Sequence, residues 1–130
     1  MRATPPPSGE VPELLAVYGT LQRRETAWPL LRPLVTGEPE PITLPGTLYD
    51  TGQGYPALLL DGGPGVPAQL FELREPAAAL PVIDEYEGPE YERTVLHLSG
   101  TTRPGTGCWV YTWIASTSGL SPLPSGWSHS

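Results

Sequence analysis

Short runs of apolar residues, bounded by Gly- and Pro-rich turns, recur along the whole chain. Runs of this length that are rich in β-branched or aromatic residues predict strands. They predict six strands, at residues 14–18, 42–49, 55–60, 66–73, 92–98 and 108–114. The turn segments TGQG and DGGPG join the second, third and fourth strands and predict an antiparallel meander, and RPGTG is a hairpin-like connection between the last two.

A helix is expected between the first and second of these strands. Thr26 has the side chain of an N-cap, Pro29 falls in the first turn, where a missing N–H is tolerated, and Gly37 is the expected end. The apolar residues of the segment fall at spacings that place them on one side of a helix: Trp28, Leu31, Leu34 and Val35.

A second short helix carries the acidic segment DEYEG. A proline fits the first turn of a helix, so Pro81 is expected to start it, and a Gly-Pro pair ends it near Glu87. At about 100° per residue, Glu87 shares a narrow apolar arc with Leu80 and Ile83. Glu85 points the opposite way. Burial, neighbouring acidic residues and the negative end of the helix all favour a raised pKa for Glu87. The alternative is a solvated acidic loop.

Together these elements predict an α+β fold, a small mixed β-barrel with two short flanking helices. The length fits one domain, at residues 13–115. Residues 1–12 are expected to be a disordered lead, because three consecutive prolines and scattered polar residues offer little to bury, and residues 116–130 a loosely ordered tail. No repeat with a period of about 20 to 50 residues is present, which excludes a solenoid or a propeller.

The chain carries 14 acidic and 7 basic residues, the latter all arginines, for a net charge of −7. No basic stretch can follow a phosphate backbone, which argues against a nucleic-acid partner. No apolar run approaches the roughly 20 residues that cross a bilayer, and the polar N-terminus is unlike a signal peptide, so we expect a cytoplasmic protein without a membrane partner. The absence of Lys and Asn, whose codons are A-rich, indicates a GC-rich bacterial genome.

Cys108 is the only cysteine, and His97 and His129 are the only histidines. A disulfide within the chain is therefore impossible, and no clustered set of zinc ligands can be assembled, so no metal is expected. No motif pairs either histidine with a serine or with Cys108, which argues against serine or cysteine hydrolase chemistry. The glycine segments lack the strand, loop and helix context of a phosphate site.

The first predicted strand ends and the chain turns toward the helix at four consecutive residues: Tyr18, Gly19, Thr20 and Leu21. Glycine permits close approach to the backbone, and successive N–H groups in such a turn can form a concave anion site. A substrate carboxylate could then be held by the main chain without a basic side chain. The alternative is an ordinary exit from a strand, which occurs in many folds.

Aromatic residues alternate along the last strand. Trp109, Tyr111 and Trp113 point to one face, where they either wall a pocket or fill the core. A buried phenol needs a hydrogen-bond partner, and for Tyr111 a substrate or Glu87 could be that partner.

Four segments occur in a fixed order: VYGTL at 17–21, PGTLYDTGQGYPAL at 45–58, IDEYEGPEYER at 83–93 and WVYTW at 109–113. Each is weak alone, but the ordered set resembles the γ-glutamylcyclotransferase-like family, whose plant members include the avirulence-induced-gene-like proteins. The resemblance implies a small mixed β-barrel with flanking helices. The chain departs from the family pattern at Pro76 and Pro81, which are expected to break the helix before Glu87.

The resemblance also assigns roles. Residues 18–21 match the turn that binds the amino-acid end of a γ-glutamyl group, largely through main-chain groups, and Glu87 matches the catalytic acid/base. Tyr111 is a further candidate for substrate contact. The implied reaction is attack of the substrate's α-amine on its own γ-carbonyl, which closes 5-oxoproline and expels an amine without a cofactor. The implied partner is a small γ-glutamyl compound.

The chain has the length of the short family members, some of which process γ-glutamylamines. A γ-glutamyl amine and a γ-glutamyl amino acid both remain open as substrates, and so does the oligomeric state. The alternative from a different class is a non-catalytic γ-glutamyl or amino-acid binding module with the same fold, although retention of Glu87 argues against it. A third reading is a structural interaction domain, which the Pro-rich ends favour only weakly.

Overall fold

The computed structural model describes residues 13–23, 25–98 and 106–123. The expected lead at residues 1–12 lies outside these residues, as do residues 124–130 and most of the RPGTG connection. The elements in chain order are β1 (Leu14–Val17), α1 (Trp28–Leu31), the 3-10 turn η1 (Arg32–Leu34), β2 (Val35–Leu44), β3 (Thr47–Asp50), β4 (Pro56–Leu59), β5 (Val66–Leu73), α2 (Pro76–Glu87), β6 (Tyr91–His97), β7 (Gly107–Trp113) and β8 (Ser121–Pro122).

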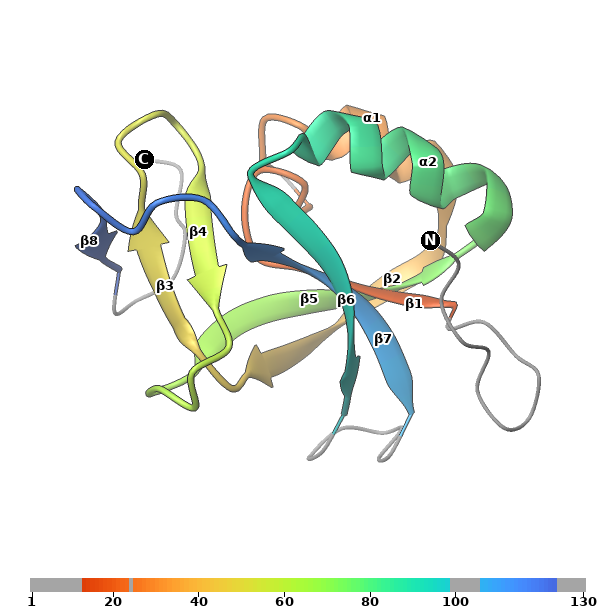
Figure 1. The fold of residues 1–130 in the computed structure, drawn as a ribbon. Coiled ribbons are helices and arrows are strands. Elements are labelled where there is room, and N and C mark those ends of the chain that lie inside the picture. The colour runs from red at the N-terminus through yellow and green to blue at the C-terminus, as the bar shows by residue number, and fades with distance from the viewer. Residues whose placement is uncertain (1–12, 24, 99–105, 124–130) are drawn as a thin grey trace.

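The strands form two sheets (Figure 1). The larger has the order β2-β5-β1-β7-β6, in which β1 runs parallel to β7 and the other neighbours are antiparallel. The smaller has the order β4-β3-β8 and is antiparallel throughout. The fold is therefore α+β, as expected. Both sheets are open within the described residues, so the expected closed barrel is not confirmed.

The central strand β1 is buried on both faces because it lies between two apolar layers. Leu14 and Ala16 belong to a cluster that includes residues of the smaller sheet, whereas Leu15 and Val17 belong to one that includes residues of α1 and α2. Successive side chains of a strand point to opposite faces, so one short run serves both layers. Figure 1 shows α1 and α2 together on one side of the larger sheet.

The expected antiparallel meander over residues 42–73 is formed only in part: β3 pairs with β4 as expected, but β5 pairs with β2 instead of with β4. The predicted strand at residues 42–49 is therefore two strands in different sheets. The chain turns between them at Pro45 and Gly46. A Cβ at Gly46 would lie 2.3 Å from the carbonyl oxygen of Leu59, far closer than atoms pack, so this turn requires glycine.

The first helix is shorter than its apolar spacing predicts. α1 ends at Leu31, continues as the 3-10 turn η1, and Val35 already begins β2. The proline two residues after α1 lacks the N–H that another α-helical turn needs. Ala27 occupies the N-cap position without a side-chain hydrogen bond, so the expected cap by Thr26 is wrong. Gly37 does not end a helix but lies within β2, at a φ of +66° beside an irregularity in the pairing with β5.

The helix α2 starts at Pro76, earlier than the expected start at Pro81, and runs unbroken to Glu87. Pro76 lies in the first turn, where its missing N–H needs no partner, and Pro81 costs one internal hydrogen bond. Gly88 ends the helix at a φ of +83°, and its N–H donates to the Asp84 carbonyl at 3.0 Å. The two prolines therefore leave the helix before Glu87 continuous.

The chain after β7 adds a short strand to the smaller sheet. β8 pairs with the end of β3, and the Leu123 N–H donates to the Leu48 carbonyl at 2.8 Å. The looseness of the tail as a whole, and the domain boundary at residue 115, stay predictions. No helix in the described part of the chain is long and apolar enough to span a bilayer.

Candidate functional site

A cavity of about 320 Å³ opens where the chain leaves β1, beside the C-terminal end of α2. Cavities of this size accept small molecules. This cavity is lined by the six residues predicted to bind substrate or carry the reaction: Tyr18, Gly19, Thr20, Leu21, Glu87 and Tyr111. The fold brings further lining residues to them, which sequence reasoning did not place there: Tyr55, Pro56, Tyr86, Glu90 and Tyr91.

The turn after β1 forms one wall of the cavity. Tyr18 is buried, and its hydroxyl donates to the Tyr111 carbonyl at 2.5 Å, which fixes the turn against β7. The carbonyls of Gly19 and Thr20 accept main-chain hydrogen bonds from the residues that follow. The N–H groups of Gly19, Thr20 and Leu21 donate to no main-chain carbonyl of the described residues. These three groups are the donors that the turn can offer to a ligand.

Gly19 meets a steric need at this turn. Its φ lies outside the left-handed region, so backbone freedom does not explain it. A Cβ at this position would lie 2.9 Å from the Cγ and Cδ atoms of Pro56, which are held in a rigid ring. A larger residue would push the turn away from Pro56, which begins β4 and lines the same cavity.

Glu87 is the last residue of α2, and it lines the cavity. Leu80 and Ile83, on its side of the helix, are buried and Glu85 is exposed, as the helical phase predicts. Burial first, and the charge of Asp84 second, raise the pKa of Glu87 to about 7. No hydrogen bond or ion pair joins its carboxylate to any described residue. Such a group both accepts and donates protons near neutral pH.

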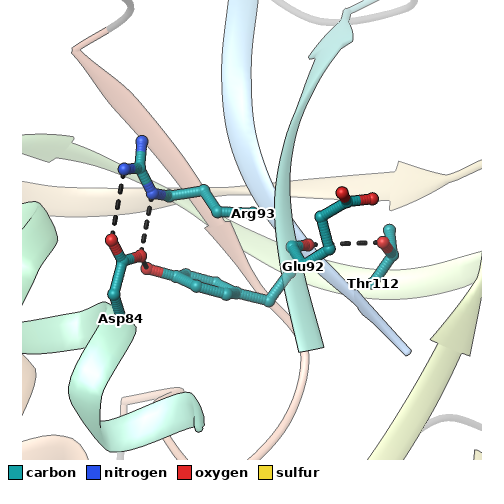
Figure 2. Close-up of polar contacts among 5 residues, drawn as sticks. Asp84, Glu92, Arg93 and Thr112 are labelled. Atoms are coloured by element: carbon teal, nitrogen blue, oxygen red, sulfur yellow. Dashed lines mark hydrogen bonds and ion pairs between the residues drawn. The ribbon is translucent and has the colours of Figure 1, made fainter. Parts of the chain in front are cut away.

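Asp84, one turn earlier on α2, is a paired carboxylate (Figure 2). Arg93 donates to its two oxygens, from Nε at 2.8 Å and from Nη2 at 3.2 Å, and the Tyr111 hydroxyl donates to Oδ1 at 2.5 Å. Burial acts to raise the pKa of Asp84, but these hydrogen bonds and the Arg93 charge outweigh it, so its pKa is lowered. Asp84 is therefore ionised at neutral pH and keeps its charge near Glu87.

The strands β6 and β7 position these partners. Arg93 and Tyr111 lie directly opposite each other in the antiparallel pair, so their side chains share one face and both reach Asp84. The sequence left a substrate or Glu87 as the partner of the Tyr111 hydroxyl, and the structure gives Asp84. Tyr111 thus lines the cavity while its hydroxyl is already engaged.

The other aromatic residues of β7, Trp109 and Trp113, are buried in the protein and do not line the cavity. The Arg93 guanidinium lies 4.3 Å from the centre of the Trp109 ring, and the rings of Tyr91 and Trp113 meet edge to face at 5.3 Å. These contacts join β6 to β7.

Two side-chain hydrogen bonds join the edges of the cavity. The hydroxyls of Thr20 and Tyr86 lie 2.6 Å apart and link the turn after β1 to α2. The Tyr55 hydroxyl shares its proton between Gln53 Oε1 at 2.9 Å and Glu90 Oε1 at 3.0 Å, and the second contact links the segment before β4 to the segment after α2. No local signal predicts either pair, because each joins segments that only the fold brings together.

Within the described residues, no three His, Cys, Asp or Glu side chains gather as they would around a metal ion. Cys108 lies in the core and not in the cavity. Burial raises the pKa of its thiol to about 11, so it is not a nucleophile at neutral pH. The polar groups that line the cavity are carboxylates, phenols, a hydroxyl and main-chain amides, which can bind polar molecules and exchange protons.

The sequence profile of the family described as "Gamma-glutamyl cyclotransferase, AIG2-like" matches residues 15–129. The chain belongs to this family. The match spans the turn after β1, α2 and the strands β6 and β7, so the AIG2-like region contains every residue of the cavity. No curated protein matches this AIG2-like chain.

Several solved structures share the AIG2-like fold. An AIG2-like protein from Mus musculus is 22% identical with a TM-score of 0.64, over 87% of this chain and 86% of that one. The protein c4763, specific to uropathogenic E. coli, is 18% identical with a TM-score of 0.68, over 86% and 87%. An uncharacterised protein from Pyrococcus horikoshii is 17% identical with a TM-score of 0.64, over 85% of each chain. At these identities the likeness shows the fold alone.

Proposed function

We propose that this protein is a cofactor-independent γ-glutamylcyclotransferase-type enzyme of the bacterial cytoplasm. It converts a γ-glutamyl amine or a γ-glutamyl amino acid into 5-oxoproline and a free amine. The observation that carries this is Glu87, which lines a small-molecule cavity, has no partner among the described residues and has a pKa of about 7. Membership of the AIG2-like family supports the same reaction.

The proposed reaction closes a ring within the substrate. The α-nitrogen bonds to the γ-carbonyl carbon, and the bond from that carbon to the leaving nitrogen breaks. At neutral pH the α-amine is an ammonium without a lone pair, so Glu87 in its ionised form must first remove a proton. In total two protons leave the α-nitrogen and both end on the expelled amine, which departs as an ammonium ion. Glu87 relays them one at a time and is regenerated.

The other task of the site is to hold the flexible γ-glutamyl chain coiled. In this proposal the N–H groups of Gly19, Thr20 and Leu21 bind the α-carboxylate, which directs the α-amine toward Glu87. Good alignment in an intramolecular reaction is worth as much as about 7–11 kcal/mol. The substrate then supplies both reacting groups, and no cofactor is needed.

Two phenols, the buried Tyr18 and the half-buried Tyr91, form part of the cavity wall. Tyr18 donates to the Tyr111 carbonyl and Tyr91 to the Pro56 carbonyl, so both hydroxyls are engaged by the main chain. Burial first, and the charge of Glu87 second, raise the pKa of Tyr18 and of Tyr91. Both phenols therefore stay protonated throughout the proposed cycle, and only Glu87 changes its charge.

Product analysis tests this function. The protein is incubated with γ-glutamyl amines, γ-glutamyl dipeptides and glutathione, and 5-oxoproline is measured. We expect 5-oxoproline from at least one of these classes. A protein that binds these compounds in calorimetry but forms no 5-oxoproline is the non-catalytic binding module instead. Neither binding nor product would contradict both readings.

A further inference from the structure

All the charged groups that line the cavity are acidic. Among the described residues around it, Glu87 and Glu90 carry carboxyl groups and none is an arginine, a lysine or a histidine. The proposed reaction uses Glu87. Glu90 takes no part in that reaction. It is the second of the two charged residues that line the cavity among the described residues, and the proposed reaction gives it no function.

Glu90 is held in place by a hydrogen bond. It follows α2, and its Oε1 lies 3.0 Å from the Tyr55 hydroxyl, whose single proton it shares with Gln53 Oε1 at 2.9 Å. Both residues line the cavity. Its second carboxylate oxygen, Oε2, has no hydrogen bond to any described residue. A carboxylate positioned in this way offers a fixed acceptor to a cationic group that enters the cavity.

Tyrosine rings line the same cavity as this carboxylate. Tyr55 and Tyr91 pack at 6.3 Å between ring centres, and Tyr86 lines the cavity from α2. The negative faces of tyrosine rings attract cations, and an ammonium group surrounded by aromatic rings and a carboxylate is bound more tightly than by the carboxylate alone. The surroundings of Glu90 therefore suit an organic cation and disfavour an anion.

We propose that the amine expelled by this enzyme carries a second, positively charged group, which Glu90 and the tyrosine rings beside it bind. This rests on the proposed cyclotransferase function and narrows its substrate to γ-glutamyl derivatives of diamines and other cationic amines. The α-ammonium of the glutamyl group is not the cation meant, because it must lie at Glu87 to lose its proton. An anionic leaving group would meet only like charge in this cavity.

Three substrates of matched length separate these cases. γ-Glutamyl-butanediamine has a cationic leaving group, γ-glutamyl-pentylamine is its neutral isostere, and γ-glutamyl-aminobutanoate is anionic. We expect kcat/KM to fall in that order, with the cationic compound favoured over the neutral one by about two- to fivefold, as a partly exposed ion pair allows. The preference should shrink as salt is added.

Substitution of the carboxylate tests the assignment. In Glu90→Gln, the ratio of kcat/KM for the cationic compound to that for the neutral one should fall to about one. Glu92→Gln is the matched control, because Glu92 is exposed on β6 and does not line the cavity; it should leave the ratio as it is in the native protein. A ratio that survives Glu90→Gln, or an equal loss on both substrates, would overturn the proposal, since equal loss would place Glu90 at the α-ammonium.

A binding measurement separates this inference from the proposed function. Calorimetry on the Glu87→Gln variant ranks the affinities of the three compounds without turnover. The same charge order in binding, with no 5-oxoproline from the native protein, would retain the cation site and reject the enzyme. Turnover by the native protein without any charge order would retain the enzyme and reject the cation site.

Discussion

Two neighbouring carboxylates in the C-terminal half of α2, Asp84 and Glu87, have different surroundings. Asp84 lies against β6 and β7, where Arg93 and Tyr111 donate three hydrogen bonds to it. Glu87, one turn later, lines the cavity and has no such partner among the described residues. The pKa of Asp84 is lowered, whereas that of Glu87 is raised to about 7.

Hydrogen-bond partners, and not position on the helix, therefore decide whether the pKa of each carboxylate is lowered or raised. Both are partly withdrawn from water, and burial alone would raise the pKa of each. Only Asp84 has donors that reverse the effect. Neighbouring acids with pKa values pushed apart are the usual signature of divided roles, one fixed charge and one proton carrier.

The largest expected effect comes from replacing the proton carrier. Glu87→Gln keeps the shape of the side chain but cannot accept a proton, so 5-oxoproline formation should fall by at least about 10²–10⁴-fold, the usual contribution of a general acid or base. Substrate affinity in calorimetry should change far less. Glu85→Gln is the matched control on the exposed side of α2 and should keep nearly full turnover. Full activity in both variants would remove Glu87 from the reaction.

The pH dependence of stability separates the two carboxylates next. The folded state holds the Glu87 proton more tightly than the unfolded state, so between pH 4.5 and about 7 the unfolded chain loses its proton first. The free energy of unfolding should therefore fall as the pH rises through this window, by about 3 kcal/mol in all. Chemical denaturation from pH 4 to 8 should show this loss in the native protein and not in Glu87→Gln.

Asp84 changes the free energy of unfolding with pH in the opposite direction, and it does so in a more acidic pH range. Its lowered pKa stabilises the folded protein above the ordinary value of 3.8, and that stability is lost as the pH falls below it. Glu87→Gln should therefore leave the acid limb of the stability curve in place. A flat difference between the variant and the native protein from pH 4 to 8 would contradict the raised pKa of Glu87.

A smaller effect is expected from the cavity wall opposite α2. Gly19→Val places a branched side chain against the ring of Pro56, which a single Cβ would already meet at 2.9 Å, and this displaces the N–H groups of the turn. We expect KM to rise at least about tenfold, or 1.4 kcal/mol of binding, with the pairing of Asp84 undisturbed. Circular dichroism checks the fold. An unchanged KM in a folded variant would remove the anion site.

The regular part of this arrangement was open to prediction from the sequence. Helical phase put Glu87 with Leu80 and Ile83 because α2 is a continuous helix, and strand alternation put Trp109 and Tyr111 on one face. The turn after β1 was found from its glycine. Each of these depends on residues close together in the chain, so local geometry was enough.

The remainder depends on contacts between distant segments. β5 pairs with β2 and not with β4, as a simple meander would have it, and no local signal marks which strand will be the partner. Tyr55 reaches Glu90 only because β4 lies near the end of α2. Arg93 lies opposite Tyr111 in the pair of β6 and β7, so both side chains lie on the same face of the sheet. A sequence-based pairing of these two strands would have placed Arg93 and Tyr111 near the same acidic residue.

The smallest effect is expected from changing the paired carboxylate itself. Asp84→Asn removes a negative charge near Glu87 and leaves Arg93 without its carboxylate partner, and both changes favour the ionised form of Glu87. Its pKa should fall, although burial, the larger cause of the shift, remains. Because Glu87 must be ionised to take the first proton, the acid limb of kcat/KM should move to lower pH, with the plateau rate little changed. The pH-rate profile is the readout, since loss of a purely structural ion pair would lower stability without moving that limb. Arg93→Gln is the informative companion: it removes the cation and leaves the Asp84 charge in place, so the limb should not move to lower pH. A limb that shifts equally in both variants would mean that general loosening of α2, and not the charge of Asp84, controls Glu87.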